Sequence, residues 1–288
     1  MISLLVPTLN EEKNIGTFLD DIISQTKIPE VVICDGGSKD KTIEIIKKYQ
    51  KEFPQIKLIQ ISEKGTGIAI NRAFENSSGD YVLHCGADWR FTNKKLFEII
   101  DKNLDKDILA VFSYIKINNT SLFKNSLKIW DVRNTGKIKM TFIRRNFFQK
   151  FPNISYGEDK IVSKKLKALK LSIKFLELDG GFERGNYENF TLSDFIRRYI
   201  WYGKTFHLYL KENNEIKEAL RIGYCMLCVL FPPLLLISAS YGFYSALNFI
   251  KKYPPVVFMF PLLATLSTFF MGLGYIKHFF NKELDIGH

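Results

Sequence analysis

Apolar runs alternate with amphipathic stretches along the first third of the chain. Runs that are closed by Pro, Gly or Asp predict buried strands, and they lie at residues 2–6, 31–34, 56–61 and 79–85. Between them, apolar positions recur at the spacing of one helix face, which predicts helices near residues 11–24, 41–49 and 66–73. Strands that alternate with helices through short connections are typical of a mostly parallel sheet with helices on both faces.

The alternation is looser beyond residue 90. It predicts further helices at 94–103 and 122–130 and from Gly157 onward, and further strands at 108–117, 137–143 and 172–178. A long predicted helix from Thr191 to about Leu210 interleaves aromatic residues with Arg197, Arg198 and Lys204. This mixture suits a helix that lies at a membrane surface. An ordinary amphipathic helix docked on the domain is the alternative.

Two long uncharged runs follow, from Ile222 to Ile250 and from Tyr253 to Ile276. Each exceeds the roughly 20 apolar residues needed to cross a hydrocarbon core of about 30 Å. Both are therefore predicted to be transmembrane helices, although a fully buried helix of a soluble protein shows the same pattern. The expected organisation is an α/β domain, an amphipathic interface helix, two transmembrane helices and a short cytoplasmic tail, at residues 1–190, 191–220, 221–250, 254–277 and 278–288.

The net charge of the chain limits the classes of partner that it is expected to bind. The 288 residues carry a net charge of +11, and lysines and arginines gather before and beside the uncharged runs. Anionic lipid headgroups or phosphorylated substrates account for this charge, whereas no zinc-finger spacing or basic heptad array points to nucleic acid. The first residues carry no secretory leader. We therefore expect a membrane protein whose α/β domain is cytoplasmic.

Several common cofactor motifs do not fit the spacing. Gly65-Thr66-Gly67 lacks the third glycine of the dinucleotide fingerprint, and no Gly-x-x-x-x-Gly-Lys-Ser phosphate loop is present. Cys34 and Cys85 lie in predicted strands, and Cys225 and Cys228 lie in an uncharged run without a partner pair. Neither a disulfide framework nor a zinc site is therefore expected.

Three acidic residues lie at the ends of predicted elements, where α/β proteins place ligands. Asp35 follows the second strand and could accept hydrogen bonds from a base or ribose, while Gly36-Gly37 allows close approach of the backbone. Asp88 follows the fourth strand and could ligate Mg or Mn, hard cations that favour carboxylate and phosphate oxygens. Asp159 opens a helix and is a candidate general base for an acceptor hydroxyl. Read alone, each residue could also be an ordinary turn or helix-dipole residue.

Four stretches of the chain resemble the motifs of one family in their order and spacing. They are Val6–Ile15, Asp35–Thr42, Gly79–Asp88 and Gly157–Asp159. With these motifs the chain is similar to family-two inverting glycosyltransferases of the GT-A fold, a Rossmann-like α/β fold, over residues 1 to about 190. The resemblance implies that Asp88 is the metal-binding carboxylate and Asp159 the catalytic base. The donor-nucleotide site that it implies comprises Pro7, Thr8, Glu11, Asp35, Gly37, Gly86 and Ala87.

The resemblance is incomplete at one position. Such enzymes usually carry two carboxylates at the end of the fourth strand, whereas here Gly86 and Trp89 flank a lone Asp88. A single carboxylate can hold a metal when diphosphate oxygens and waters complete the shell. The processive-synthase motif Gln-x-x-Arg-Trp is also absent, which favours transfer of a single sugar over polymerisation.

The activity implied is a direct displacement at the anomeric carbon of a UDP-, GDP- or dTDP-linked sugar, assisted by Mg or Mn. The expected acceptor is lipid-linked or close to the membrane, and membrane lipids are expected partners. Two alternatives remain, namely a polyprenyl-phosphate monosaccharide synthase and a catalytically silent paralogue that binds a nucleotide sugar or a partner. Candidate phosphate or acceptor contacts are Arg144, Arg145, Glu158, Lys164 and Arg184.

Overall fold

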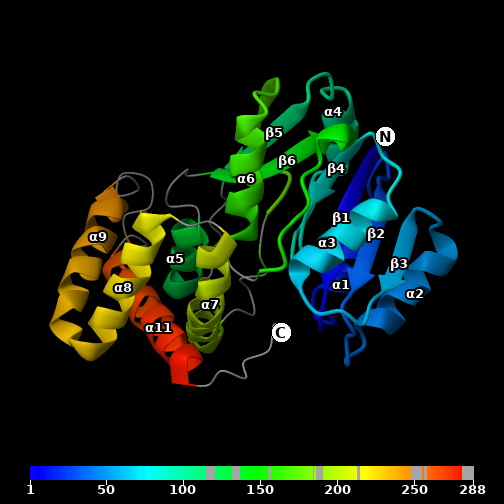
Figure 1. The fold of residues 1–288 in the computed structure, drawn as a ribbon. Coiled ribbons are helices and arrows are strands. Elements are labelled where there is room, and N and C mark those ends of the chain that lie inside the picture. Colours follow the sequence, from blue (N-terminus) through cyan, green and yellow to red (C-terminus); the bar gives the residue numbers. More distant parts are fainter. Residues whose placement is uncertain are drawn as a thin grey trace.

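The computed structural model describes residues 1–114, 121–131, 137–154, 157–183, 185, 191–212, 215–247, 255 and 258–280. Figure 1 shows an α/β part built on a sheet and, beside it, a bundle formed by the carboxyl-terminal helices. The expected strand and helix order holds throughout the first part. Only the ends of the elements differ, by a few residues.

The strands of the described residues form one seven-stranded sheet in the order β3-β2-β1-β4-β6-β5-β7. Strands β1 to β4 are mutually parallel, whereas β6 runs antiparallel to both β4 and β5. The predicted mostly parallel mixed sheet is therefore confirmed. The strands are β1 (Ile2–Thr8), β2 (Glu30–Asp35), β3 (Ile56–Gln60), β4 (Tyr81–His84), β5 (Ile108–Tyr114), β6 (Lys137–Arg144) and β7 (Ile173–Leu178).

Helices cover both faces of the sheet. Side chains alternate across a strand, so Leu4 and Val6 of β1 belong to one core cluster and Leu5 to the other. The first cluster is covered by α1 (Ile15–Ile23), α2 (Thr42–Glu52) and α4 (Leu96–Asp101). The second is covered by α3 (Thr66–Glu75) and α6 (Glu158–Ala168). A short 3-10 turn, η1 (Arg145–Phe147), follows β6.

The second part is a helical bundle centred on α11 (Phe260–Phe280), which packs against α5 (Leu122–Asp131), α7 (Leu192–Glu212), α8 (Ile216–Leu230) and α9 (Leu235–Leu247). Helices α7 and α11 approach closely. A Cβ at Gly203 of α7 would lie 1.9 Å from the carbonyl oxygen of Met271, so a glycine is required at this crossing. Small residues at helix contacts allow such close approach.

Residues 221–250 do not form the single transmembrane helix that was expected. Helix α8 ends at Leu230, a 3-10 turn η2 (Pro232–Leu234) follows, and α9 begins at Leu235. Proline lacks the N–H that would continue the helix. At 1.5 Å per residue, α8 and α9 are only about 22 Å and 20 Å long, shorter than a hydrocarbon core of about 30 Å. The expected interface helix at 191–220 is likewise divided between α7 and the start of α8.

Within the part of the chain that the structure describes, one helical stretch is long and apolar enough to cross a membrane. It is Phe260–His278 in α11, and 33% of it is buried inside the fold. Core helices of soluble proteins have the same length and composition. Two transmembrane helices are therefore not confirmed.

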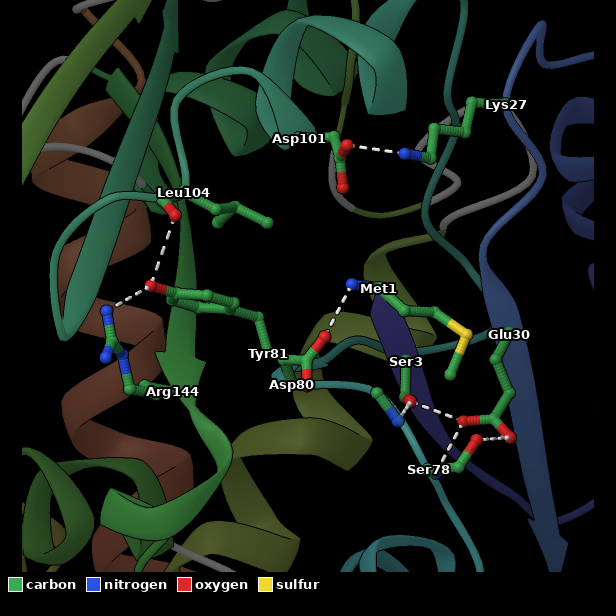
Figure 2. Close-up of polar contacts among 11 residues, drawn as sticks. Met1, Ser3, Lys27, Glu30, Ser78, Asp80, Tyr81, Asp101, Leu104 and Arg144 are labelled. Atoms are coloured by element: carbon green, nitrogen blue, oxygen red, sulfur yellow. Dashed lines mark hydrogen bonds and ion pairs between the residues drawn. The ribbon is translucent and has the colours of Figure 1, made fainter.

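A polar network closes the amino ends of the central strands (Figure 2). The carboxylate of Glu30 accepts hydrogen bonds from the hydroxyl groups of Ser3 and Ser78, and the Ser78 N–H donates to it at 2.7 Å. Lys57 Nζ lies 2.7 Å from the same carboxylate. Burial alone would raise the pKa of Glu30, but these donors outweigh it and lower the pKa to about 2. The network therefore stabilises the ionised carboxylate within the fold.

We predict that Glu30→Gln destabilises the protein by about 2 kcal/mol at pH 7, because hydrogen bonds to a buried charge are lost. The stability contributed by Glu30 is complete above its ordinary pKa of 4.5 and is lost as the pH falls toward 2. The difference between wild type and variant should therefore shrink between pH 4.5 and pH 2. Denaturant unfolding at several pH values measures it.

Glu177→Gln is the matched control, because Glu177 is an exposed residue that forms an ion pair with Lys137. Exposed ion pairs contribute little to stability, so this variant should unfold like wild type. If both variants behave alike, or if the effect of Glu30→Gln does not change with pH, the buried network has no special role.

Candidate active site

Three strand ends meet at the carboxyl edge of the sheet. Strand β1 lies between β2 and β4, with Thr8 beside Asp35 in the register and Leu5 beside His84. The chain continues along β1 after β4, where Cys85 N–H donates to the carbonyl of Leu5 at 3.2 Å. Neighbouring strands are about 4.8 Å apart, so the ends of β2 and β4 are separated by roughly 10 Å. The topology therefore brings Asp35 and the loop that contains Asp88 to one edge.

Asp35 organises the loop that follows β2. Its carboxylate is fully buried and accepts hydrogen bonds from the N–H groups of Gly37 and Ser38 at 2.9 and 2.8 Å. The hydroxyl groups of Ser38 and Thr8 also donate to it, at 2.5 and 3.2 Å. A carboxylate has about four acceptor positions, so this structure occupies them internally. Its contact with a base or ribose remains a prediction.

Hydrogen bonds join the segment after β1 to the segment after β2. Asn10 N–H donates to Ser38 Oγ at 2.8 Å, and Lys39 N–H donates to Asn10 Oδ1 at 2.9 Å. Glu11 N–H donates to Thr42 Oγ1 at 2.8 Å. These reciprocal bonds hold Glu11 in a defined place next to Pro7 and Thr8.

Ionisation of Glu11 is disfavoured at this edge. Burial raises the pKa of Glu11, and negative charge on Asp88 and Asp40 raises it further, against a hydrogen bond from Asn14 that lowers it. The segment of Glu11 follows β1 and the loop of Asp88 follows β4, so both border the carboxyl edge of the sheet although they come from different motifs.

The structure also shows why a second carboxylate at position 86 does not fit without a rearrangement. A Cβ placed at Gly86 would lie 2.5 Å from Asp88 Oδ1. The Asp88 side chain therefore folds back over Gly86. Ala87 and Trp89 are buried, and Trp89 stacks on Phe182, which fixes the loop from beneath.

The amino end of α6 lies at the same edge. The segment before it crosses the carboxyl end of β4, where the Phe151 ring contacts His84 with centroids 5.3 Å apart. Gly157 has φ +79°, and a Cβ there would lie 2.5 Å from the Tyr209 ring of α7. Asp159 is exposed in the first turn, and Lys160 N–H donates to its Oδ1 at 2.9 Å. Glu158 beside it is half-buried.

The predicted arginine contacts lie elsewhere. Arg144 pairs with Tyr81 at the start of β4 because β6 runs antiparallel to it, and Arg144 Nη2 donates to Tyr81 Oη at 3.1 Å (Figure 2). Arg145 Nη1 donates to Ser77 Oγ at 2.8 Å. Both arginines are therefore at the amino ends of the strands, opposite Asp88. The structure therefore does not bring these two candidate phosphate or acceptor contacts to the candidate site.

Of the two remaining basic candidates, the structure describes the position of Lys164 but not that of Arg184. Lys164 is exposed on α6, and its Nζ lies 2.9 Å from Glu215 before α8. With Lys160 and Glu218, 3.3 Å apart, it ties α6 to α8. Arg184 lies outside the described residues.

A divalent cation would find hard oxygen donors here but no complete cage. Among the described residues, no group of three or more His, Cys, Asp or Glu side chains is arranged to hold a metal. Asp88 and Glu11 border this edge with hard carboxylate oxygens of the kind that Mg or Mn prefers, and phosphate oxygens and waters would have to supply the remaining ligands. The donor chemistry therefore fits a cation shared with a phosphate-bearing substrate.

Sequence reasoning missed the contacts that position these groups. The pairing of Asn10 with Ser38, of Glu11 with Thr42 and of Gly157 with Tyr209 joins segments about 30 to 50 residues apart. No local sequence pattern predicts such contacts. Only the order of the motifs indicated that their ends would meet.

Comparison with known proteins places the chain in a family. The model of "Glycosyl transferase family 2" matches residues 3–166. A dolichyl-phosphate beta-glucosyltransferase of Trichomonas vaginalis is 36% identical over 113 residues, 36% of this chain and 35% of that protein. A Methanococcus voltae dolichyl N-acetyl-alpha-D-glucosaminyl phosphate 3-beta-D-2,3-diacetamido-2,3-dideoxy-beta-D-glucuronosyltransferase is 36% identical over 168 residues, 54% of this chain and 51% of that protein. The chain thus spans about half or less of these two relatives.

The fold has a solved counterpart. The structure of a Pyrobaculum calidifontis mannosyltransferase in complex with GDP-Man and Mn2+ superposes with a TM-score of 0.59 at 17% identity, covering 98% of this chain and 88% of that one. At this identity the likeness concerns the fold alone. The family match covers more than half of the chain, and the seven-stranded mixed sheet agrees with it. The chain therefore belongs to glycosyltransferase family 2 and has the α/β GT-A fold.

Proposed function

We propose that this protein is an inverting glycosyltransferase that moves a single sugar from a nucleotide-sugar donor to a lipid-linked or membrane-proximal acceptor. The observation that carries the proposal is the convergence of Thr8, Asp35 and the loop of Asp88 at the carboxyl edge of the sheet. Burial and the negative charge of Asp88 also raise the pKa of Glu11, which follows β1 at this edge. Such an arrangement is typical of a site that is completed by a ligand.

The donor occupies the edge between β2 and β4. The loop after β2 is held by Asp35, and Gly37 has φ +93° with open space at its Cβ position, so a ligand can approach the backbone. Thr8 at the end of β1 and Glu11 in the segment after it border the same space. The base and ribose of a UDP-, GDP- or dTDP-sugar lie toward Asp35, and the diphosphate lies toward Asp88.

Asp88 and Glu11 are the residues that would hold Mg or Mn together with the donor diphosphate. When bound, the cation supplies positive charge that stabilises the departing nucleoside diphosphate. The mannosyltransferase with the same fold was solved with Mn2+ and GDP-Man, which supports this cofactor and donor class.

Asp159 acts on the acceptor. Its exposed carboxylate takes the proton of an acceptor hydroxyl while the oxygen attacks the anomeric carbon. The bond between that carbon and the diphosphate oxygen breaks, and the configuration inverts. If the acceptor is a polyprenyl phosphate, its oxygen is already ionised and Asp159 orients it instead.

The second candidate, a polyprenyl-phosphate monosaccharide synthase, is favoured by the relative named as a dolichyl-phosphate beta-glucosyltransferase. A catalytically silent paralogue is the third, because Gly86 stands where a second carboxylate is usual. The carboxylate of Glu11 at the same edge of the sheet as the Asp88 loop argues against this third candidate.

The function is tested by incubating membranes that contain the protein with labelled UDP-, GDP- and dTDP-sugars and Mn2+, followed by lipid extraction. We expect transfer by wild type and a loss of about 100-fold or more in Asp159→Asn and in Asp88→Asn. Asp80→Asn is the matched control, since Asp80 is exposed at the opposite end of the strands. It should retain wild-type transfer.

The outcomes separate the candidates. Label on polyprenyl phosphate itself selects the synthase, and label on a preformed lipid-linked glycan selects the extending transferase. Equal transfer by wild type and Asp159→Asn would show that Asp159 has no role in the reaction. Absence of transfer by wild type across a broad donor and acceptor panel would select the silent paralogue.

A second prediction concerns Glu11→Gln. Removing one of two repelling carboxylates should leave the ligand-free protein as stable as wild type, or more stable by about 2–4 °C in Tm. It should nevertheless lower transfer at limiting Mn2+. Thermal unfolding and a Mn2+ titration of activity measure the two effects.

Glu12→Gln is the matched control, because Glu12 is the exposed neighbour of Glu11 and accepts a hydrogen bond from Lys41 N–H. It should leave the Mn2+ dependence unchanged. A Glu11→Gln variant that is destabilised, or one whose Mn2+ dependence equals that of wild type, would refute the role of Glu11 beside Asp88.

A further inference from the structure

An uncharged surface covers the second half of α8, η2 and α9. No charged residue lies between Ile222 and Leu247. Seven large apolar side chains in this segment are between 54% and 72% exposed, and we call them the hairpin face: Leu227, Leu230, Phe231, Leu236, Ile237, Phe243 and Tyr244. So many exposed apolar side chains in one short segment are uncommon on soluble proteins and indicate a binding partner.

Helices α8 and α9 form a hairpin. Tyr224 Oη of α8 donates to the carbonyl of Leu234 at 2.9 Å and lies 2.9 Å from Ser238 Oγ of α9. In one straight helix, residues 224 and 238 would be about 21 Å apart. Helix α9 therefore folds back beside α8, and Figure 1 shows both at the end of the molecule far from β1 to β3. The turn contains the exposed residues Phe231, Pro232 and Pro233.

Helix α11 runs alongside α7 in the same direction. Phe195 packs in one cluster with Leu263, Gly203 faces Met271, and the ring of His207 stacks on His278 at 3.7 Å. The contacts thus follow both helices from their beginnings to their ends. Neither helix can change its depth in a bilayer without the other.

The charged residues of α7 make it unfavourable for α11, which packs beside it, to cross a bilayer. Arg197, Arg198 and Lys204 lie in the stretch of α7 that flanks the middle of α11. A bilayer crossing by α11 would carry these groups into hydrocarbon, where charged side chains are strongly disfavoured. Helices with basic and aromatic residues instead lie at the level of the headgroups.

We propose that the hairpin face inserts into one leaflet of a lipid bilayer and that the chain enters and leaves on the same side without crossing it. Lys217, exposed at the start of α8, then lies at the headgroups and can contact anionic lipid, and Arg221 beside it pairs with Glu218 at 3.1 Å. The occupant of the hairpin face is lipid. A second copy of the chain is the competing occupant.

Insertion sets the position of the candidate base. Lys160 and Lys164 of α6 pair with Glu218 and Glu215, which lie at the start of α8. Because Asp159 is next to Lys160, the depth of the hairpin determines its height above the membrane. The inference rests on the proposed membrane-proximal acceptor, but its tests require no sugar transfer.

The first test is flotation of the purified full-length protein with vesicles of phosphatidylcholine and phosphatidylglycerol. Wild type should float, and the double variant Leu230→Glu/Leu236→Glu should bind about ten-fold more weakly or worse, since two exposed leucines lose their lipid contact. Phe175→Glu is the matched control, because Phe175 of β7 is 67% exposed and lies outside the bundle. It should float like wild type.

Two results would overturn the lipid assignment. One is a double variant that floats as well as wild type. The other is a wild type that stays off vesicles and sediments as a dimer that the double variant disrupts, which assigns the hairpin face to a second copy.

The second test determines the side of the membrane. Pro255→Cys, exposed beyond α9, and Lys165→Cys, exposed on α6, are labelled with a membrane-impermeant maleimide in sealed vesicles of both orientations. Wild type is the background control, because its four cysteines are buried. Both engineered cysteines should react from the same side. Labelling of Pro255→Cys from the opposite side, or only after detergent, places the chain across or within the bilayer and overturns single-leaflet insertion.

Discussion

The position of α6 between the sheet and the helical bundle is the constraint on which the rest of the structure depends. Val162 and Leu166 bury one side of α6 on the sheet, whereas Ile161 packs with Phe206, Tyr209 and other bundle residues. The contact of Gly157 with the Tyr209 ring fixes where the helix begins. Because one short helix contacts both parts, the exposed carboxylate of Asp159 has a defined place relative to each.

The two ends of the central strands have opposite electrostatic character. At the amino ends, the Glu30 carboxylate is surrounded by hydroxyl groups, an N–H and Lys57, so that ionisation is favoured. At the carboxyl ends, burial and the negative charge of Asp88 raise the pKa of Glu11, so that its ionisation is opposed. Stability is thus concentrated at one edge of the sheet, and the other edge retains repulsion that a cation or polar ligand can relieve. This division is common where function and stability compete.

The helical bundle fixes the orientation of the α/β part relative to the hairpin of α8 and α9. Close glycine contacts join α7 and α11 along their length, and the uncharged hairpin of α8 and α9 lies on the side away from the sheet. Ion pairs from α6 reach the start of that hairpin. Under the proposed function, these contacts give the Asp159 carboxylate a fixed relation to the lipid surface at which the acceptor would lie.

Periodicity along the sequence determined the strands, the helices and the ends at which Asp35, Asp88 and Asp159 lie, because these features depend on neighbouring residues. Tertiary structure alone decided that β6 inserts antiparallel beside β4, which moves Arg144 and Arg145 away from Asp88. It also decided that Glu11 and the Asp88 loop border the same edge of the sheet and that α9 folds back toward α8. The prolines marked a break in that segment, but its direction depends on Tyr224, Ser238 and packing on α11. Such contacts join residues that are far apart in the sequence, so the pattern of a single segment does not predict them.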